Sequence, residues 1–146
     1  MKAAILVESL TGNTWKAAEL VATELQDAGW GITGLSKVRQ PDHASIQEAD
    51  LVLVGTWVHG LFVIGQAPWG AAALSQLPAM RGKKAAVFCT FALNPAKTLD
   101  TMTSIITGVG ADVVGGFAMS RRHLDRNAHE FAGRLLDVAP SLVNLR

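Results

Sequence analysis

The sequence of 146 residues has little of several features that would each indicate a particular class of protein. It contains one cysteine, Cys89, so we expect neither an intrachain disulfide framework nor a metal cluster held by thiolates. Its formal net charge is only +1, which argues against nucleic acid or an anionic membrane as a partner. No stretch approaches the roughly 20 apolar residues that a membrane span needs.

The apolar run near the N-terminus ends at Glu8, which is too early for the apolar core of a signal peptide. Hydrophobic residues make up 49% of the chain and charged residues 17%, an ordinary globular composition. The length suits one domain with a proper core. We therefore expect residues 1–146 to form a single domain of a cytoplasmic protein without a membrane span.

Short apolar runs alternate along the chain with segments of helical periodicity. Strands are predicted at residues 3–7, 32–38, 51–54, 85–89 and 113–119. Helical segments are predicted at 15–28, 46–49, 67–77, 94–109 and 124–139. Asn94 is expected to be the N-cap of the fourth helical segment, with Pro95 at its first position. This alternation predicts an α/β fold, in which helices cover both faces of a parallel sheet.

In such a sheet the ligand site lies beyond the carboxyl ends of the strands. The segment after the first strand, Ser9-Leu10-Thr11-Gly12-Asn13-Thr14, offers three hydroxyls, an amide and a glycine just before a helix. The N–H groups at a helix start bind phosphate well, and Gly12 lets the backbone approach a ligand closely. The alternative interpretation is that Ser9 or Thr11 only caps the helix. The P-loop ending and the GxGxxG dinucleotide pattern are both absent from this loop.

The same six residues match the S/T-x-T-G-N-T phosphate signature of flavodoxins, and the chain resembles that family over nearly its whole length. The resemblance implies a flavodoxin-like three-layer α/β/α sandwich with five parallel strands in the order 2-1-3-4-5. It also implies FMN at the strand tips, with its phosphate in the loop from Ser9 to Thr14.

Two further loops enclose the flavin ring in flavodoxins. The first corresponds here to the cofactor-binding candidates Thr56, Trp57, Val58, His59 and Gly60. By resemblance, Trp57 packs on the ring, while backbone groups of residues 58–60 lie near its reactive N5 edge, where Gly60 permits a peptide flip. Trp57 alternatively covers an apolar patch without touching flavin. His59 either contacts the flavin or a partner, or is simply solvated.

The second loop supplies the candidates Thr90, Phe91, Ala92, Leu93 and Asn94. Family members often stack a tyrosine on the ring here, but this chain contains no tyrosine, and Phe91 is the natural substitute. Backbone groups of residues 92–94 are expected to contact the pyrimidine edge of the ring. No catalytic residue and no metal ligand is predicted, and Cys89 is expected to be a small core residue.

The function implied by the resemblance is electron transfer between protein partners, a reductase and an acceptor. Electron-carrying flavodoxins are usually strongly acidic, whereas this chain is nearly neutral. One alternative is therefore an FMN-dependent oxidoreductase that uses NAD(P)H and a quinone. Another is a flavin-free domain that binds proteins. Arg121, Arg122 and His123 follow the fifth strand and either attract an anionic partner or form a solvated turn.

Overall fold

The structure, a computed structural model, describes residues 1–9, 12–59, 67–68, 71–92, 94–95 and 97–143. Its centre is a sheet of five parallel strands in the order β2-β1-β3-β5-β6, which confirms the predicted order 2-1-3-4-5. These strands are β1 (Lys2–Val7), β2 (Gly31–Lys37), β3 (Leu51–His59), β5 (Lys84–Phe91) and β6 (Asp112–Ser120). A two-residue strand, β4 (Ala67–Pro68), pairs antiparallel with the end of β3.

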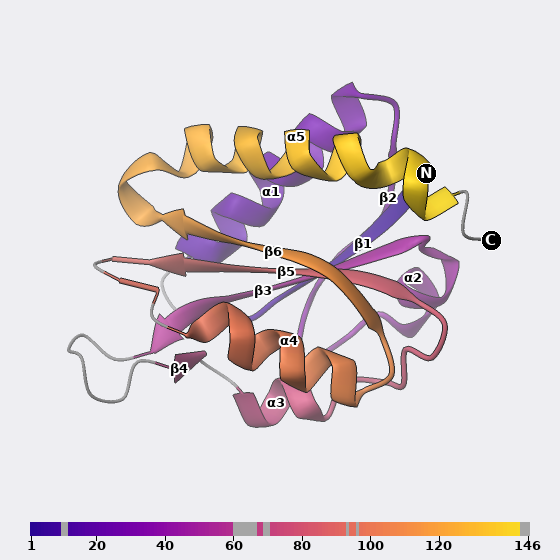
Figure 1. Cartoon of the computed structure of the whole chain (residues 1–146), viewed down its shortest axis with the longest axis horizontal. Helices are drawn as coiled ribbons and strands as arrows, with labels where there is room; N and C mark the ends of the chain where they lie inside the picture. The colour runs from indigo at the N-terminus through magenta and orange to yellow at the C-terminus, as the bar shows by residue number, and fades with distance from the viewer. Residues whose placement is uncertain (10–11, 60–66, 69–70, 93, 96, 144–146) are drawn as a thin grey trace.

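Helices cover both faces of this sheet (Figure 1). One face carries α1 (Asn13–Asp27) and α5 (Leu124–Val143), which pack side by side. The other face carries α2 (His43–Glu48), α3 (Ala71–Ser75) and α4 (Thr98–Gly108). A short 3-10 helix, η1 (Arg121–His123), links β6 to α5. The fold is therefore the predicted three-layer α/β/α sandwich.

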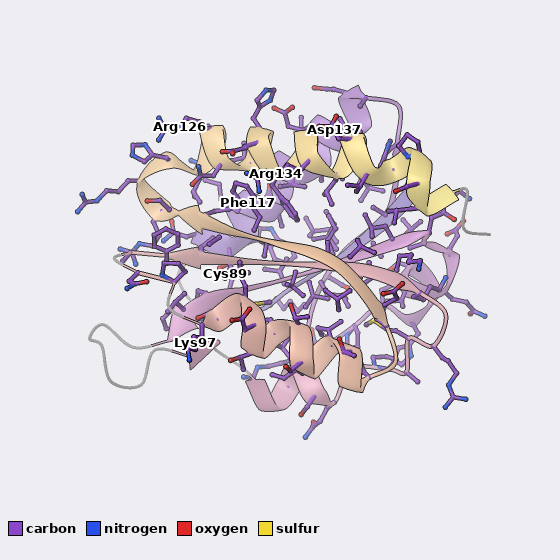
Figure 2. The ribbon with its side chains drawn as sticks, in the orientation of Figure 1. Cys89, Lys97, Phe117, Arg126, Arg134 and Asp137 are labelled. Atoms are coloured by element: carbon purple, nitrogen blue, oxygen red, sulfur yellow. The ribbon has the colours of Figure 1, made fainter. Side chains whose placement is uncertain are left out.

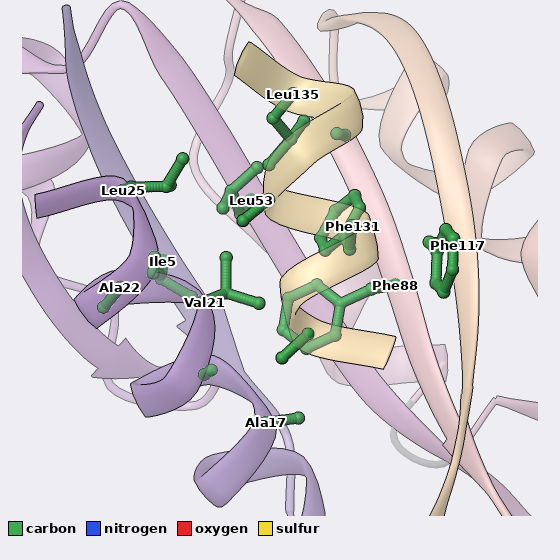
Figure 3. Packing of buried hydrophobic residues seen from close by; sticks show 14 of the residues in the cluster. Ile5, Ala17, Val21, Ala22, Leu25, Leu53, Phe88, Phe117, Phe131 and Leu135 are labelled. Carbon is green, nitrogen blue, oxygen red and sulfur yellow. The ribbon is translucent and has the colours of Figure 1, made fainter. Parts of the chain in front are cut away.

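The central strands are buried on both faces because each face has its own apolar layer. In β1 the side chains of Ile5 and Leu6 are both fully buried, yet they belong to the two different layers. Under α1 and α5 the layer is rich in aromatic rings (Figure 3), with the ring centroids of Phe88 and Phe131 separated by 5.7 Å. Within the described residues, no helix is both long and apolar enough to span a membrane.

The ends of two elements differ from the prediction. We expected β3 to stop at Val54, but it continues to His59, and β5 likewise continues to Phe91. Trp57 is paired with Thr90 across these strands, and Val58 is paired with Pro68 of β4. Residues 55–59 form a strand because each of them pairs with β5 or β4, and partners distant in sequence cannot be recognised from local patterning.

Two predicted helices are shorter than expected. The segment 67–77 contains β4 before the helix α3, and Pro68 is tolerated there because β4 lies at an edge of the sheet. Asn94 is not an N-cap, because α4 begins at Thr98 and its N-cap residue is Lys97. The Thr98 N–H instead donates to the Pro95 carbonyl at 3.1 Å in a separate turn. The helix therefore begins only where its apolar stripe does, close to Leu99.

Candidate functional site

The loop after β1 leads directly into α1. Gly12 is the N-cap residue, with φ +90° and ψ −10°, a left-handed conformation that favours glycine. Ser9 Oγ accepts a hydrogen bond from the Gly12 N–H at 3.1 Å, so Ser9 closes the turn that precedes the helix. Among the described residues no side chain caps α1. Ser9 therefore accepts a hydrogen bond from the N-cap residue and does not itself cap the helix, as the alternative interpretation had it. Leu10 and Thr11 lie outside the described residues.

The start of α1 has the features of an anion site. The first backbone hydrogen bond of the helix runs from the Lys16 N–H to the Gly12 carbonyl at 2.8 Å. The first N–H groups of an α-helix in general find their acceptors outside the helix, and the helix dipole places partial positive charge at this end. Glu8 is the nearest acid in sequence, and Arg39 Nε lies 3.1 Å from its carboxylate. This ion pair offsets the negative charge beside the loop.

A buried hydrogen bond ties this loop to the end of β5. Thr14 Oγ1 and Thr90 Oγ1 lie 2.8 Å apart, and each residue is only 1% exposed. The two residues are 76 positions apart in the sequence, so local patterning could not reveal their contact. The bond fixes the first turn of α1 against the strand end that carries Phe91 and Ala92.

Replacing Thr14 with valine should test how far this bond supports the site. Valine keeps the shape of the side chain but leaves the Thr90 hydroxyl buried without its partner, which should cost about 1–3 kcal/mol of unfolding free energy. Urea unfolding of Thr14→Val, Thr90→Val and the double variant measures the coupling, and the double variant should lose less than the sum of the two. Thr23→Val, which removes an exposed hydroxyl bond to Glu19 in the same helix, is the matched control. Strict additivity would mean that the bond contributes nothing.

The candidates on β3 and β5 fall on two faces of the sheet. Trp57 is partly buried and paired with Thr90, so by strand alternation it faces the side of α1, where Thr14 also lies. Phe91 is partly buried and packs on the opposite layer, with the residues under α3 and α4. The two aromatic residues thus lie at the same end of the sheet but on different faces.

The other candidates fall into three groups. Thr56 is fully buried and Val58 is 8% exposed, so both contribute to the core beneath the strand ends. The backbone of His59 lies in β3, paired with Ala67, and its side chain is outside the described residues. Gly60 and Leu93 are also outside them. Asn94 lies between β5 and α4.

A hollow of about 300 Å³ lies at this end of the sheet, and four residues line it: Asn13, Ala92, Arg121 and Arg122. Asn13 is the first residue of α1, and Ala92 follows β5. The two arginines belong to η1, beyond the end of β6. The structure therefore brings the predicted phosphate loop, the predicted second ring loop and the basic turn to one place. The position of the arginines beside Asn13 follows from the packing of α5 against α1.

Residues 4–130 match the family described as the flavodoxin domain. The chain belongs to the flavodoxin family. That match covers most of the sequence, includes the loop from Ser9 to Thr14 and agrees with the order of the strands. No curated protein is significantly similar to this chain in sequence.

Several solved flavodoxins share the fold. Flavodoxin 2 from Bacillus cereus superimposes with a TM-score of 0.70 at 19% identity, covering 94% of this chain and 99% of that one. A Streptococcus pneumoniae flavodoxin gives 0.68 at 22% identity, with the same two coverages. A Fusobacterium nucleatum flavodoxin solved with bound flavin mononucleotide gives 0.67 at 10% identity, covering 93% and 97%. At these identities the similarity establishes the fold.

Membership of the flavodoxin family favours a flavin-dependent electron carrier over the two alternatives predicted from the sequence. Flavodoxins act together with redox partner proteins. Burial raises the pKa of the Cys89 thiol to about 12, so the thiol is protonated at neutral pH. It is fully buried within the layer under α4, as predicted for a small core residue (Figure 2).

Proposed function

We propose that this chain binds FMN, with the phosphate at the start of α1, and carries single electrons between a reductase and an acceptor protein. The observation that carries the proposal is the start of α1 itself. A left-handed Gly12 opens a helix of 15 residues that no described side chain caps, immediately after the central strand β1. Backbone N–H groups and the positive end of the helix dipole make such a position favourable for an anion.

The donors around this position suit a phosphate monoester. Hydroxyl and amide groups dominate the loop, and Glu8, the acid beside it, is paired with Arg39. Asn13 at the start of α1 and Ala92 after β5 line one hollow, so the phosphate loop and the second ring loop face a common space. The Fusobacterium relative was solved with FMN bound, which supports the same cofactor here.

We assign the remaining roles according to the element on which each residue lies. Trp57 contacts one face of the ring from the side of α1, where its large flat side chain excludes water. The backbone after β5, at Ala92 and Asn94, provides polar groups for the edge of the ring. The hydrogen bond between Thr14 and Thr90 joins the start of α1 to the end of β5. Bound FMN supplies the electron-transfer chemistry, and the protein binds the flavin and adjusts its potential.

The direct test is to purify the protein, record its visible spectrum and identify the cofactor released on denaturation by mass spectrometry. We expect a yellow protein that releases FMN, or a colourless one that takes up added FMN stoichiometrically and quenches its fluorescence. A protein that is colourless and does not bind added FMN would contradict the proposal.

A second measurement separates the carrier from the oxidoreductase. The FMN-loaded protein is mixed with NADPH and a soluble quinone, without any other protein, and NADPH oxidation is followed. A carrier should show negligible turnover until a flavodoxin reductase is added. Rapid NADPH oxidation by the protein alone would replace the carrier assignment with a quinone oxidoreductase.

A further inference from the structure

The charges of the chain are distributed unevenly between the two ends of the sheet. We define the cationic end as the described segments beyond the carboxyl ends of the parallel strands, residues 8–9, 12–16, 37–43, 59, 67–68, 91–92, 94–95, 97–100 and 120–126. Lys and Arg outnumber Asp and Glu by seven to four within these segments, whereas in the rest of the chain they are outnumbered by eight to six. The near-neutral net charge is therefore the sum of a positive cationic end and a negative remainder of the chain.

The cations of this end are also less neutralised than those elsewhere. Away from it, Lys2 is paired with Glu48, Lys84 with Asp112, and Arg134 with Glu130. At the cationic end Arg39 is paired with Glu8. The other cations there are exposed and form no ion pair with any described residue: Lys16, Lys37, Lys97, Arg121, Arg122 and Arg126. Their charge is available to an incoming molecule.

Two of these cations lie beside the proposed cofactor site. Arg121 and Arg122 line the hollow that Asn13 and Ala92 share with them. Lys97 and Arg126 lie at the same end of the molecule, toward which the arrows of β5 and β6 point (left in Figure 2). Charges on two proteins interact strongly only within about 10 Å at 0.1 M salt. A protein that approaches the flavin therefore meets the positive end, while the negative remainder is screened from it.

The arrangement fits a protein surface better than a nucleotide. The hollow of about 300 Å³ is at the lower limit of small-molecule pockets, which is small for a dinucleotide. The cations come from several separate loops and are interspersed with Asp42, Asp100 and Asp125, whereas a polyanion needs a continuous basic track. A broad, open and moderately positive surface is typical of electrostatic docking between proteins.

We propose that the cationic end is the docking surface for a redox partner whose own surface around its redox centre is acidic. This inference rests on the proposed function, because the surface serves electron transfer only if the flavin is bound beside it. The charge of this docking surface would be opposite to that of a strongly acidic carrier, which docks on basic partners. Arg121 and Arg122 are its central residues, because they are the cations that line the hollow.

The test measures electron transfer from the reduced, FMN-loaded protein by anaerobic stopped-flow. The probes are the haem domain of cytochrome b5, which is acidic, and cytochrome c, which is basic. Second-order rate constants are recorded between about 10 mM and about 300 mM NaCl. We compare the native protein with Arg121→Gln/Arg122→Gln and with the control Lys2→Gln/Arg81→Gln, which removes the same charge from the opposite end. The Kd for FMN is measured for each protein by fluorescence quenching.

We expect the rate constant with cytochrome b5 to fall at least about tenfold as salt rises, while that with cytochrome c does not fall. At low salt the arginine variant should react with cytochrome b5 about three to ten times more slowly than the native protein, and the control variant at the native rate. All rate constants are recorded with FMN at saturation, so a difference in the Kd for FMN between the proteins does not enter them.

Three results would overturn the inference. Equal rates for both variants, or a rate with cytochrome b5 that rises with salt, would reject the docking surface while leaving FMN binding and the carrier role intact. A weaker Kd for FMN in the arginine variant, together with an unchanged rate constant at saturating FMN, would show that the arginines serve only the cofactor phosphate. Failure of the native protein to bind FMN would reject the proposed function and, with it, this surface.

Discussion

Replacing Gly55 with alanine should destabilise the fold by about 3 kcal/mol, near the upper end of what overpacking a core usually costs. Gly55 is paired with Phe88 in the neighbouring strand, and a methyl carbon at Gly55 would lie 2.6 Å from Cε1 of that ring, with two further ring atoms still closer. Phe88 is fully buried and packs against Phe131, so the ring has nowhere to move without displacing α5. Urea unfolding measures the loss as a lower midpoint at an unchanged m-value.

A control and a rescue make this result specific. Gly115 lies in β6 with nothing within 4 Å of an added Cβ, so Gly115→Ala should be neutral or slightly stabilising. Phe88→Leu removes the ring that a methyl at Gly55 would meet. The double variant Gly55→Ala/Phe88→Leu should therefore be about as stable as Phe88→Leu alone, whereas simple addition of the two losses would contradict the assigned contact.

Those parts of the fold that depend on local patterning were predictable. Each central strand is a continuous apolar run because it is buried on both faces, and each long helix has an apolar stripe of period 3.6. The order of strands followed from the resemblance to flavodoxins and is confirmed by the pairing of β1 with both β2 and β3. A glycine-containing loop before the first helix was predicted, but α1 begins at Asn13, two residues earlier than expected.

The parts that depend on distant partners were not predictable. β3 extends beyond Val54 because Trp57 pairs with Thr90 and Val58 with Pro68, and neither pairing leaves a local signal. Asn94 and Pro95 have the residue types of a helix start, but the helix begins at Thr98. The hydrogen bond between Thr14 and Thr90 joins loops that the sequence shows only as separate segments.

The nearly neutral net charge of the chain can be interpreted only when the positions of the charges in the fold are known. As a sum over the sequence it argued against a conventional acidic carrier and made an oxidoreductase or a carrier with different partners an alternative, without identifying a partner. Parallel strands bring their carboxyl ends to one edge, so the loops proposed to hold the cofactor lie at the same end as the surplus cations. The same topology therefore determines both where the flavin would bind and which charge a partner would meet.

The largest expected effect on function is at Gly12. Gly12→Val should weaken FMN binding about 10- to 100-fold, because a β-branched residue held at φ +90° costs on the order of 1–3 kcal/mol and the loop should relax away from that conformation. Nothing lies within 4 Å of a Cβ added at Gly12, so the effect comes from backbone strain and not from a clash. Relaxation would turn the first N–H groups of α1 away from the phosphate. Fluorescence titration of the flavin-free protein measures the Kd.

Riboflavin and asparagine provide the two controls for this prediction. Riboflavin has the same ring but no phosphate, so its Kd should change by less than about threefold in Gly12→Val if the loop contacts only the phosphate. Asparagine tolerates the left-handed conformation better than valine, so Gly12→Asn should retain most of the FMN affinity. Equal losses of affinity for FMN and riboflavin would show that the phosphate does not bind in this loop. Equal losses for valine and asparagine would show that the side chain blocks the ligand directly, and that the φ angle of Gly12 is not what the cofactor requires.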